Sequence, residues 1–257
     1  MEINWESQVL SSVSKVIPKL SCLEIDIDKL HEVAAELSED SFSINYEGNT
    51  NTVPKEYIRK TMLINTLNFV FTDFLTSVKY KIENYSDTDA MVYQIDKALD
   101  QGIPLTQGRF MRDMNLKEFK TLFTGNIVMP MADEKVKILN NVGDILVTKY
   151  GGDWINFIDD GPKKLYDNGK GLVERLVRDF KRFDDHSIFE NEKVYFLKLA
   201  QLAFWGIHRE LSKRYFYIED MENMTAFADY IIPVALESFG IVKYLSLIHI
   251  SEPTRLH

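Results

Sequence analysis

The chain has 257 residues, of which 45% are hydrophobic, 27% are charged and 16 are phenylalanine. A chain of this length and composition buries a sizeable core, which excludes a disordered polymer and a repetitive Gly/Pro-rich fibre. The formal net charge of −9 argues against duplex nucleic acid as a partner, because the chain as a whole would repel a phosphate backbone.

The cysteine content and the lack of a targeting signal restrict the class of protein further. The single cysteine, Cys22, excludes an internal disulfide and a cysteine-rich zinc site. The N-terminus has neither the basic start nor the apolar core of a secretory signal. The longest apolar stretch, from Met62 to Leu75, is interrupted by Asn65, Asn68 and Asp73 and is too short to cross a bilayer. We therefore expect a cytoplasmic protein that does not contact a membrane. The sequence leaves the oligomeric state of the protein open.

The end of the chain has a different character from the rest. Leu245–Arg255 reads LSLIHISEPTR, and all eleven residues agree with the in-frame translation of a sequencing adapter. Segments of this kind are excluded from fold reasoning. We expect residues 1–244 to form a single domain, residues 245–257 to be adapter-derived, and the native C-terminus to be missing.

Apolar residues recur at helical spacing along most of the chain, which predicts a mainly α fold. One predicted helix begins near Asp26, a second covers Tyr57–Leu75, and a third runs from Met91 to Leu99 before Gly102. A fourth follows a capping box of Asn115 and Glu118, a fifth runs from Ala132 to Gly151, and a sixth runs from Leu172 to Phe180. Strand signals are limited to Ser77–Tyr85 and Phe42–Tyr46. We predict one helical domain with at most a short β-hairpin or strand pair.

The common catalytic motifs are absent from the sequence. It has no Gly-rich dinucleotide or phosphate loop, no paired zinc-binding histidines and no G-x-S-x-G elbow. The histidines are scattered, and Cys22 is better explained as a packing residue than as a nucleophile.

Lys198 is the first residue that departs from its local pattern. On a helix it would share a face with Val194, Leu197 and Gln201, beside the apolar stripe. An ordinary explanation is a lysine at the edge of the stripe that extends its ammonium into water. A functional explanation is a lysine held in a pocket.

Asp229 is the second such residue, with apolar and aromatic neighbours on both sides in the segment Met224–Pro233. A buried carboxylate needs a partner, and the ammonium of Lys198 would keep it ionised. The alternative is that Asp229 caps a helix that Pro233 opens or kinks.

Five stretches share order and spacing with one known family. They are Leu67–Phe71, Ala98–Pro104, Glu134–Gly143, Val194–Gln201, and Thr225–Tyr230 with Pro233. From about Ser12 to Tyr244 the chain resembles the queuosine salvage protein family, the queuosine 5′-phosphate N-glycosylases. The resemblance implies a helical fold related to DNA glycosylases and hydrolysis that releases queuine from a small nucleotide for reuse in tRNA modification. It places Lys198 and Asp229 on the two catalytic positions.

The chemistry of the implied reaction suits these residue types. Breaking a ribosyl C–N bond passes through an oxocarbenium-like state, so we assign Asp229 to the sugar, where a carboxylate stabilises or attacks the anomeric carbon. Lys198 either orients Asp229 or contacts the base or phosphate. No metal or organic cofactor is expected, because water and these two side chains suffice for the implied reaction. Candidates for binding the substrate are Asn68, Phe69, Phe71, Gln201, Phe227 and Tyr230, although each phenylalanine is also explained by core packing.

The chain also departs from the family at several positions near these motifs. These departures are Thr72, Leu199, Gly206, Ile231 and Val234, where the family usually has Trp, Arg, an acid, Arg and Gln. They leave the exact substrate open and keep two alternatives: a non-catalytic binder of a 7-deazapurine nucleotide or nucleoside, and a glycosylase of altered specificity. A further alternative, a DNA-repair glycosylase, is supported by fold analogy alone, and the net charge of the chain argues against it.

Overall fold

The computed structural model describes residues 7–37, 49 and 51–245. Helices make up most of its secondary structure, and the strands form short two-stranded sheets, which confirms the mainly α prediction. The chain divides into two compact units. Unit 1 contains the described residues of 1–47, 186–198 and 225–257, and unit 2 contains those of 48–185 and 199–224. Folding of residues 1–244 as one domain stays a prediction.

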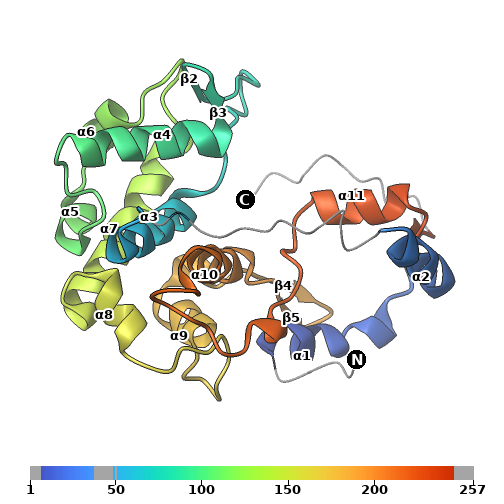
Figure 1. Cartoon of the computed structure of the whole chain (residues 1–257). Coiled ribbons are helices and arrows are strands. Elements are labelled where there is room, and N and C mark those ends of the chain that lie inside the picture. The colour runs from blue at the N-terminus through green and yellow to red at the C-terminus, as the bar shows by residue number, and fades with distance from the viewer. Residues whose placement is uncertain (1–6, 38–48, 50, 246–257) are drawn as a thin grey trace. The chain divides into compact units, whose positions relative to one another are not determined.

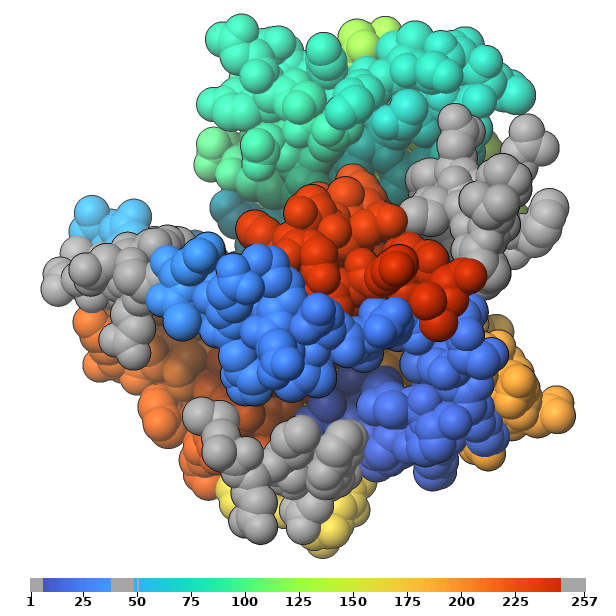
Figure 2. All heavy atoms as spheres, turned by 90° about the vertical axis from the view of Figure 1, so that its right-hand side faces the viewer, coloured from blue at the N-terminus to red at the C-terminus, as the bar shows by residue number. Residues whose placement is uncertain are grey.

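Unit 1 joins the two ends of the described chain. Its elements are α1 (Gln8–Ser14), the 3-10 helix η1 (Ile17–Lys19), β1 (Leu23–Ile25), α2 (Ile27–Glu36), β4 (His186–Phe189), β5 (Glu192–Tyr195), α11 (Ile231–Ser238) and β6 (Val242–Tyr244). Strand β1 pairs antiparallel with β6, so the blue N-terminal and red C-terminal segments lie side by side in Figure 2. Strands β4 and β5 form a hairpin, and Ser12 on α1 accepts a hydrogen bond from the Tyr195 amide.

Unit 2 contains the larger set of helices. Its elements are α3 (Pro54–Leu67), β2 (Lys81–Ile82), β3 (Tyr85–Ser86), α4 (Asp87–Asp100), α5 (Gly108–Asp113), α6 (Leu116–Leu122), α7 (Ala132–Tyr150), α8 (Trp154–Asp159), α9 (Leu172–Asp179), the 3-10 helices η3 (Lys181–Phe183) and η4 (Met221–Asn223), and α10 (Lys198–Leu211) after its first residue. Figure 1 shows α3 beside α7, with α4 and α6 toward the β2–β3 hairpin and α8 to α10 at the opposite end of this unit. Among the described helices, none is long and apolar enough to span a bilayer.

An aromatic cluster forms part of the core of unit 2. Trp154 lies fully buried with its ring centroid 4.7 Å from that of Phe180, and Phe157 meets both rings edge-on. Edge-to-face and tilted arrangements of this kind are the favoured ones for aromatic pairs. The cluster links α8 to the end of α9, which fixes the position of the η3 turn that follows.

Several helix boundaries agree with the sequence prediction. Asp26 caps α2 by accepting a hydrogen bond from the Lys29 amide. Asn115 and Glu118 form the predicted reciprocal capping box of α6. Gly151 ends α7 in the left-handed conformation, which a glycine adopts without steric cost.

Three predictions about local structure are wrong. The helix predicted for Tyr57–Leu75 ends at Leu67, because the backbone turns left-handed at Val70. The strand predicted for Ser77–Tyr85 is broken by positive φ angles at Ser77 and Glu83, leaving only the short β2–β3 hairpin. Val194 lies in β5, so it shares no helical face with Lys198. The strand predicted for Phe42–Tyr46 and the tail from residue 246 onward lie outside the described residues.

Close packing of α5 on α7 gives a stability prediction. A Cβ at Gly143 would lie 2.2 Å from the Arg112 amide nitrogen and 2.6 Å from the Gly108 carbonyl oxygen. Because both atoms belong to backbone, Gly143→Ala is expected to lower the free energy of unfolding in urea by about 3 kcal/mol or more. Gly206→Ala is the matched helical control. Its Cβ would meet only the Thr61 methyl at 3.6 Å, so it should be neutral or stabilising by up to about 1 kcal/mol. Equal stability of the two variants would contradict this packing.

Candidate functional site

Unit 1 brings Lys198 and Asp229 into direct contact. The Lys198 ammonium donates a hydrogen bond to Oδ2 of Asp229. The side chain of Lys198 is 28% exposed to solvent and that of Asp229 is 23% exposed. The pair joins two segments that are 31 residues apart in the chain. The contact is therefore an ion pair that is partly shielded from water.

The backbone places Lys198 at a strained junction. The preceding Leu197 is fully buried and has a φ of 51°, a left-handed conformation that is uncommon for a residue with a side chain. Lys198 then opens α10, although the dipole at a helix N-terminus disfavours a cation. Both features cost stability, and such costs tend to concentrate at functional sites.

Asp229 lies just ahead of α11, where the helix amides stabilise negative charge. Burial acts to raise the pKa of Asp229, but the hydrogen bond and charge of Lys198 outweigh it. With the amides of Ile231 and Tyr230 they hold the pKa below its ordinary value. The carboxylate is therefore ionised at neutral pH and accepts from both a lysine and a helix N-terminus. Of the two alternatives that the sequence left open, the structure shows the pairing with Lys198. Tyr230 and not Asp229 is the N-cap of α11, which has no side-chain cap, although the Ile231 amide lies 3.5 Å from Oδ1 of Asp229.

The other predicted site residues fall in both units. Near Asp229 in unit 1, Phe227 is half-buried and Tyr230 is 72% exposed. Gln201 belongs to unit 2 and is fully buried on α10. Asn68, Phe69 and Phe71 lie together in unit 2, directly after α3, and all three are half-buried.

The segment Asn68–Phe71 is held by a cation that the sequence reading missed. Lys135 on α7 has no exposed surface, and its ammonium donates to the carbonyl oxygens of Phe69 and Val70, the latter at 3.1 Å. The same nitrogen lies 3.8 Å from the centroid of the Phe69 ring. A signal was available, because the spacing of Ala132, Lys135 and Leu139 puts the lysine on the apolar face of the predicted helix.

Arg182 in η3 is a second cation at this segment. Its guanidinium donates to the carbonyl oxygens of Thr66 at 2.8 Å and Asn68 at 3.3 Å, and lies 4.7 Å from the Phe69 ring centroid. Burial lowers the pKa of Lys135 to about 7, and the charge of Arg182 acts in the same direction. Burial likewise lowers the pKa of Arg182 to about 10, against the nearby Asp185.

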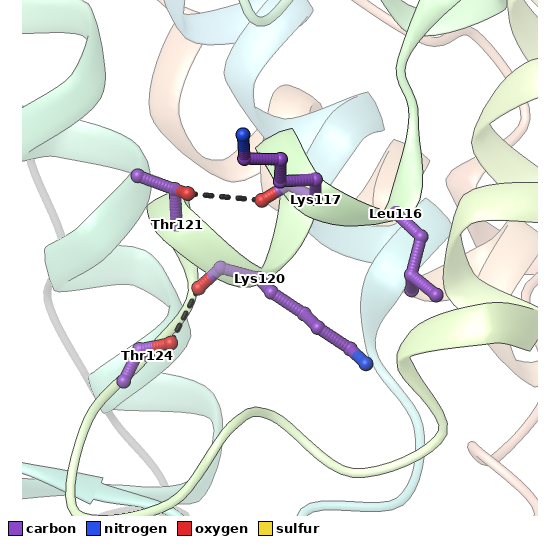
Figure 3. A pocket seen from close by; sticks show the side chains of 5 residues that line it. All are labelled: Leu116, Lys117, Lys120, Thr121 and Thr124. Atoms are coloured by element: carbon purple, nitrogen blue, oxygen red, sulfur yellow. Dashed lines mark hydrogen bonds between the residues drawn. The ribbon is translucent and has the colours of Figure 1, made fainter.

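Two surface depressions in unit 2 lie apart from the predicted residues. One, of about 530 Å³, is an open hollow on α6 where the side chains of Thr121 and Thr124 turn back onto backbone carbonyls of their own helix (Figure 3). The other, of about 760 Å³, lies beside the bidentate pair of Arg59 and Asp153. Its lining mixes charges of both signs, so it favours no single class of ligand. Within the described residues, no three His, Cys, Asp or Glu side chains gather as metal ligands would.

Comparison with known proteins identifies the family. A family model described as queuosine salvage protein matches residues 46–251, which is most of the chain. The chain belongs to the queuosine salvage protein family. This confirms the resemblance seen in the five sequence stretches. Of the residues that depart from the family pattern, Ile231 and Val234 are exposed on α11, while Leu199 and Gly206 are half-buried on α10.

Curated relatives that match this chain carry the name queuosine 5′-phosphate N-glycosylase/hydrolase. The protein of Mus musculus is 30% identical over 191 residues, covering 71% of this chain and 55% of the relative. That of Bos taurus is 27% identical over 218 residues, covering 81% and 62%. That of Sphaerobacter thermophilus is 24% identical over 246 residues, covering 94% and 75%. The chain thus spans little more than half the length of the two mammalian relatives.

Proposed function

We propose that this protein hydrolyses the N-glycosidic bond of queuosine 5′-phosphate and releases queuine for reuse in tRNA modification. The observation that carries the proposal is the partly shielded ion pair of Lys198 and Asp229. Membership of the queuosine salvage family and the names of the relatives support it. The substrate is a small nucleotide, and the proposal involves no direct binding of nucleic acid and no cofactor. The cytoplasm is the proposed compartment.

Asp229 is assigned to the sugar side of the reaction. As the bond from C1′ to the base breaks, its electron pair leaves with the base and positive charge develops on the ribose. An ionised carboxylate fixed beside C1′ stabilises that charge, or attacks C1′ and is displaced by water in a second step. Water supplies the new C1′ oxygen, and the departing 7-deazaguanine nitrogen takes up a proton. The products are queuine and ribose 5-phosphate.

Lys198 is assigned to keeping Asp229 ionised and oriented. An ammonium hydrogen-bonded to a carboxylate favours its charged form and fixes its rotamer. Phe71, Phe227 and Tyr230 are proposed to contact the planar base, and Asn68 to hydrogen-bond its edge. Phe69 and Gln201 complete the proposed set as supporting residues, because Gln201 is fully buried and the Phe69 ring lies beside two cations.

The proposal is tested by offering the protein a panel of substrates. Queuosine 5′-phosphate, the nucleoside queuosine and guanosine 5′-monophosphate are incubated with the protein, and each free base is followed by chromatography. We expect queuine from queuosine 5′-phosphate, less from the nucleoside, and no guanine. Binding of queuosine 5′-phosphate without release would replace the enzyme by a non-catalytic binding protein. Faster release from another nucleotide would instead indicate a glycosylase of altered specificity.

A further inference from the structure

The segment Asn68–Phe71 adopts a conformation that is unfavourable by itself. Val70 has a φ of 44°, and the branched Cβ of valine makes the left-handed region a genuine outlier. A residue held there is strained and persists only where the surrounding structure holds it in place. The helix α3 has just ended, so its last carbonyl groups also need donors outside the helix.

Two cations supply those donors, and their burial costs additional free energy. Lys135 bonds the carbonyls of Phe69 and Val70, and Arg182 bonds those of Thr66 and Asn68. Within the described chain, neither cation makes an ion pair with a carboxylate. Burying a charge without an ion-pair partner is expensive, and the charge of the nearby Asp185 offsets only part of that cost for Arg182. The strained backbone at Val70 and the two desolvated cations therefore meet at the same segment.

The arrangement determines which side chains of the segment stay available. The Phe69 ring already lies within 5 Å of both cations and serves as their cation–π partner. Phe71 is farther away, with its ring centroid 5.4 Å from the Lys135 nitrogen. Asn68 accepts a hydrogen bond from the Thr88 hydroxyl through Oδ1 at 3.1 Å, which leaves its amide N–H groups without an acceptor among the described residues.

A purely structural role does not require charge at this position. An apolar side chain of similar volume fills a buried site at no greater cost than an ion, and often at a lower one. What the cations add is a fixed backbone geometry at a point where helix hydrogen bonding has ended. The side chains that this geometry fixes include an aromatic ring and a free amide donor, which suit a planar base with polar edges.

We propose that Lys135, assisted by Arg182, is a positioning residue that holds Asn68–Phe71 in the form that binds the base of the substrate through Phe71 and the Asn68 amide. The identity of the base rests on the proposed function. The holding of the segment by Lys135 does not.

The test compares Lys135→Met with Lys137→Met, an exposed lysine two residues along the same helix. Hydrogen exchange of the amides of residues 69–72 reports on the segment without any ligand. Affinity for free queuine, and KM and kcat with queuosine 5′-phosphate, report on binding. We expect faster exchange in Lys135→Met, with queuine affinity reduced and KM raised about 10-fold. The kcat should change much less, as when uniform binding is lost. Lys137→Met should match the wild type in each measurement.

Two outcomes overturn the proposal. Unchanged exchange would show that Lys135 does not hold the segment, and faster exchange with unchanged affinity and KM would show that the segment does not bind the base. If the wild type bound queuine but released none from the nucleotide, the proposed function would fail while the affinities still decided the role of Lys135. If no protein bound queuine, the proposed function and the binding of the base by this segment would both fail, while the exchange rates would still decide whether Lys135 holds the segment. Should Lys135→Met not fold, Arg182→Lys, which keeps the charge but loses the two-pronged donor, is expected to show the same changes to a smaller extent.

Discussion

Asp229→Asn is expected to reduce the rate of queuine release from queuosine 5′-phosphate by at least about 100- to 1000-fold. The amide keeps the size of the side chain but removes the negative charge that stabilises an oxocarbenium-like ribose. Substrate affinity should change little, because the charge matters most when the C–N bond is breaking. The measurement is kcat by chromatography of queuine, beside the dissociation constant of the intact nucleotide.

Glu237→Gln provides the control for this variant. Glu237 is an exposed carboxylate on α11, the helix that Asp229 precedes, so its loss changes the net charge of the same region by the same amount. It should keep the wild-type kcat. Thermal melting of both variants shows whether either has lost its fold. Wild-type turnover by Asp229→Asn would remove Asp229 from the reaction.

Lys198→Met is expected to have the second-largest effect, with a distinctive dependence on pH. Lys198 now holds the pKa of Asp229 below its ordinary value, so removing the ammonium leaves burial to raise that pKa. The reactive form is the ionised carboxylate. A higher pKa means that activity is lost at a higher pH as the solution is acidified, so the acid limb of the kcat/KM profile should move upward. At neutral pH we expect a fall of about 10- to 100-fold, because the carboxylate also loses its fixed orientation.

A lysine elsewhere in unit 1 separates this effect from a general change of charge. Lys243 is exposed on β6, and Lys243→Met should leave the acid limb where it is in the wild type. An unmoved acid limb in Lys198→Met, with kcat reduced, would instead assign Lys198 to the base or the phosphate.

The sequence predicted the helices that carry local signals. Asn115 with Glu118 and the glycine at position 151 act within a few residues of themselves, so their effect can be read without the rest of the fold. The apolar run after Tyr57 was harder to read. Its periodicity continues past Leu67, but the backbone is diverted by carbonyl contacts to Lys135 and Arg182, which lie 65 and 114 residues away from their acceptors Val70 and Asn68.

In the candidate site, too, the sequence predicted what local signals determine and missed what distant contacts determine. The composition around Asp229 indicated that this carboxylate needs a partner, and the structure pairs it with Lys198. The backbone at Lys198 was not predictable from helical spacing, because the residues before it form the β4–β5 hairpin. Glu190 and Asn191 both take positive φ angles in the turn of that hairpin. Glutamate is an unusual residue for such a turn, so the usual hairpin signal was absent.

The proposed hydrolysis is tested most directly by a time course of queuine release with queuosine 5′-phosphate in large excess over the protein, run side by side for wild type and Asp229→Asn. We expect many turnovers per molecule of wild-type protein and a nearly flat line for the variant. No queuine from a folded wild-type protein, or equal release by both proteins, would contradict it.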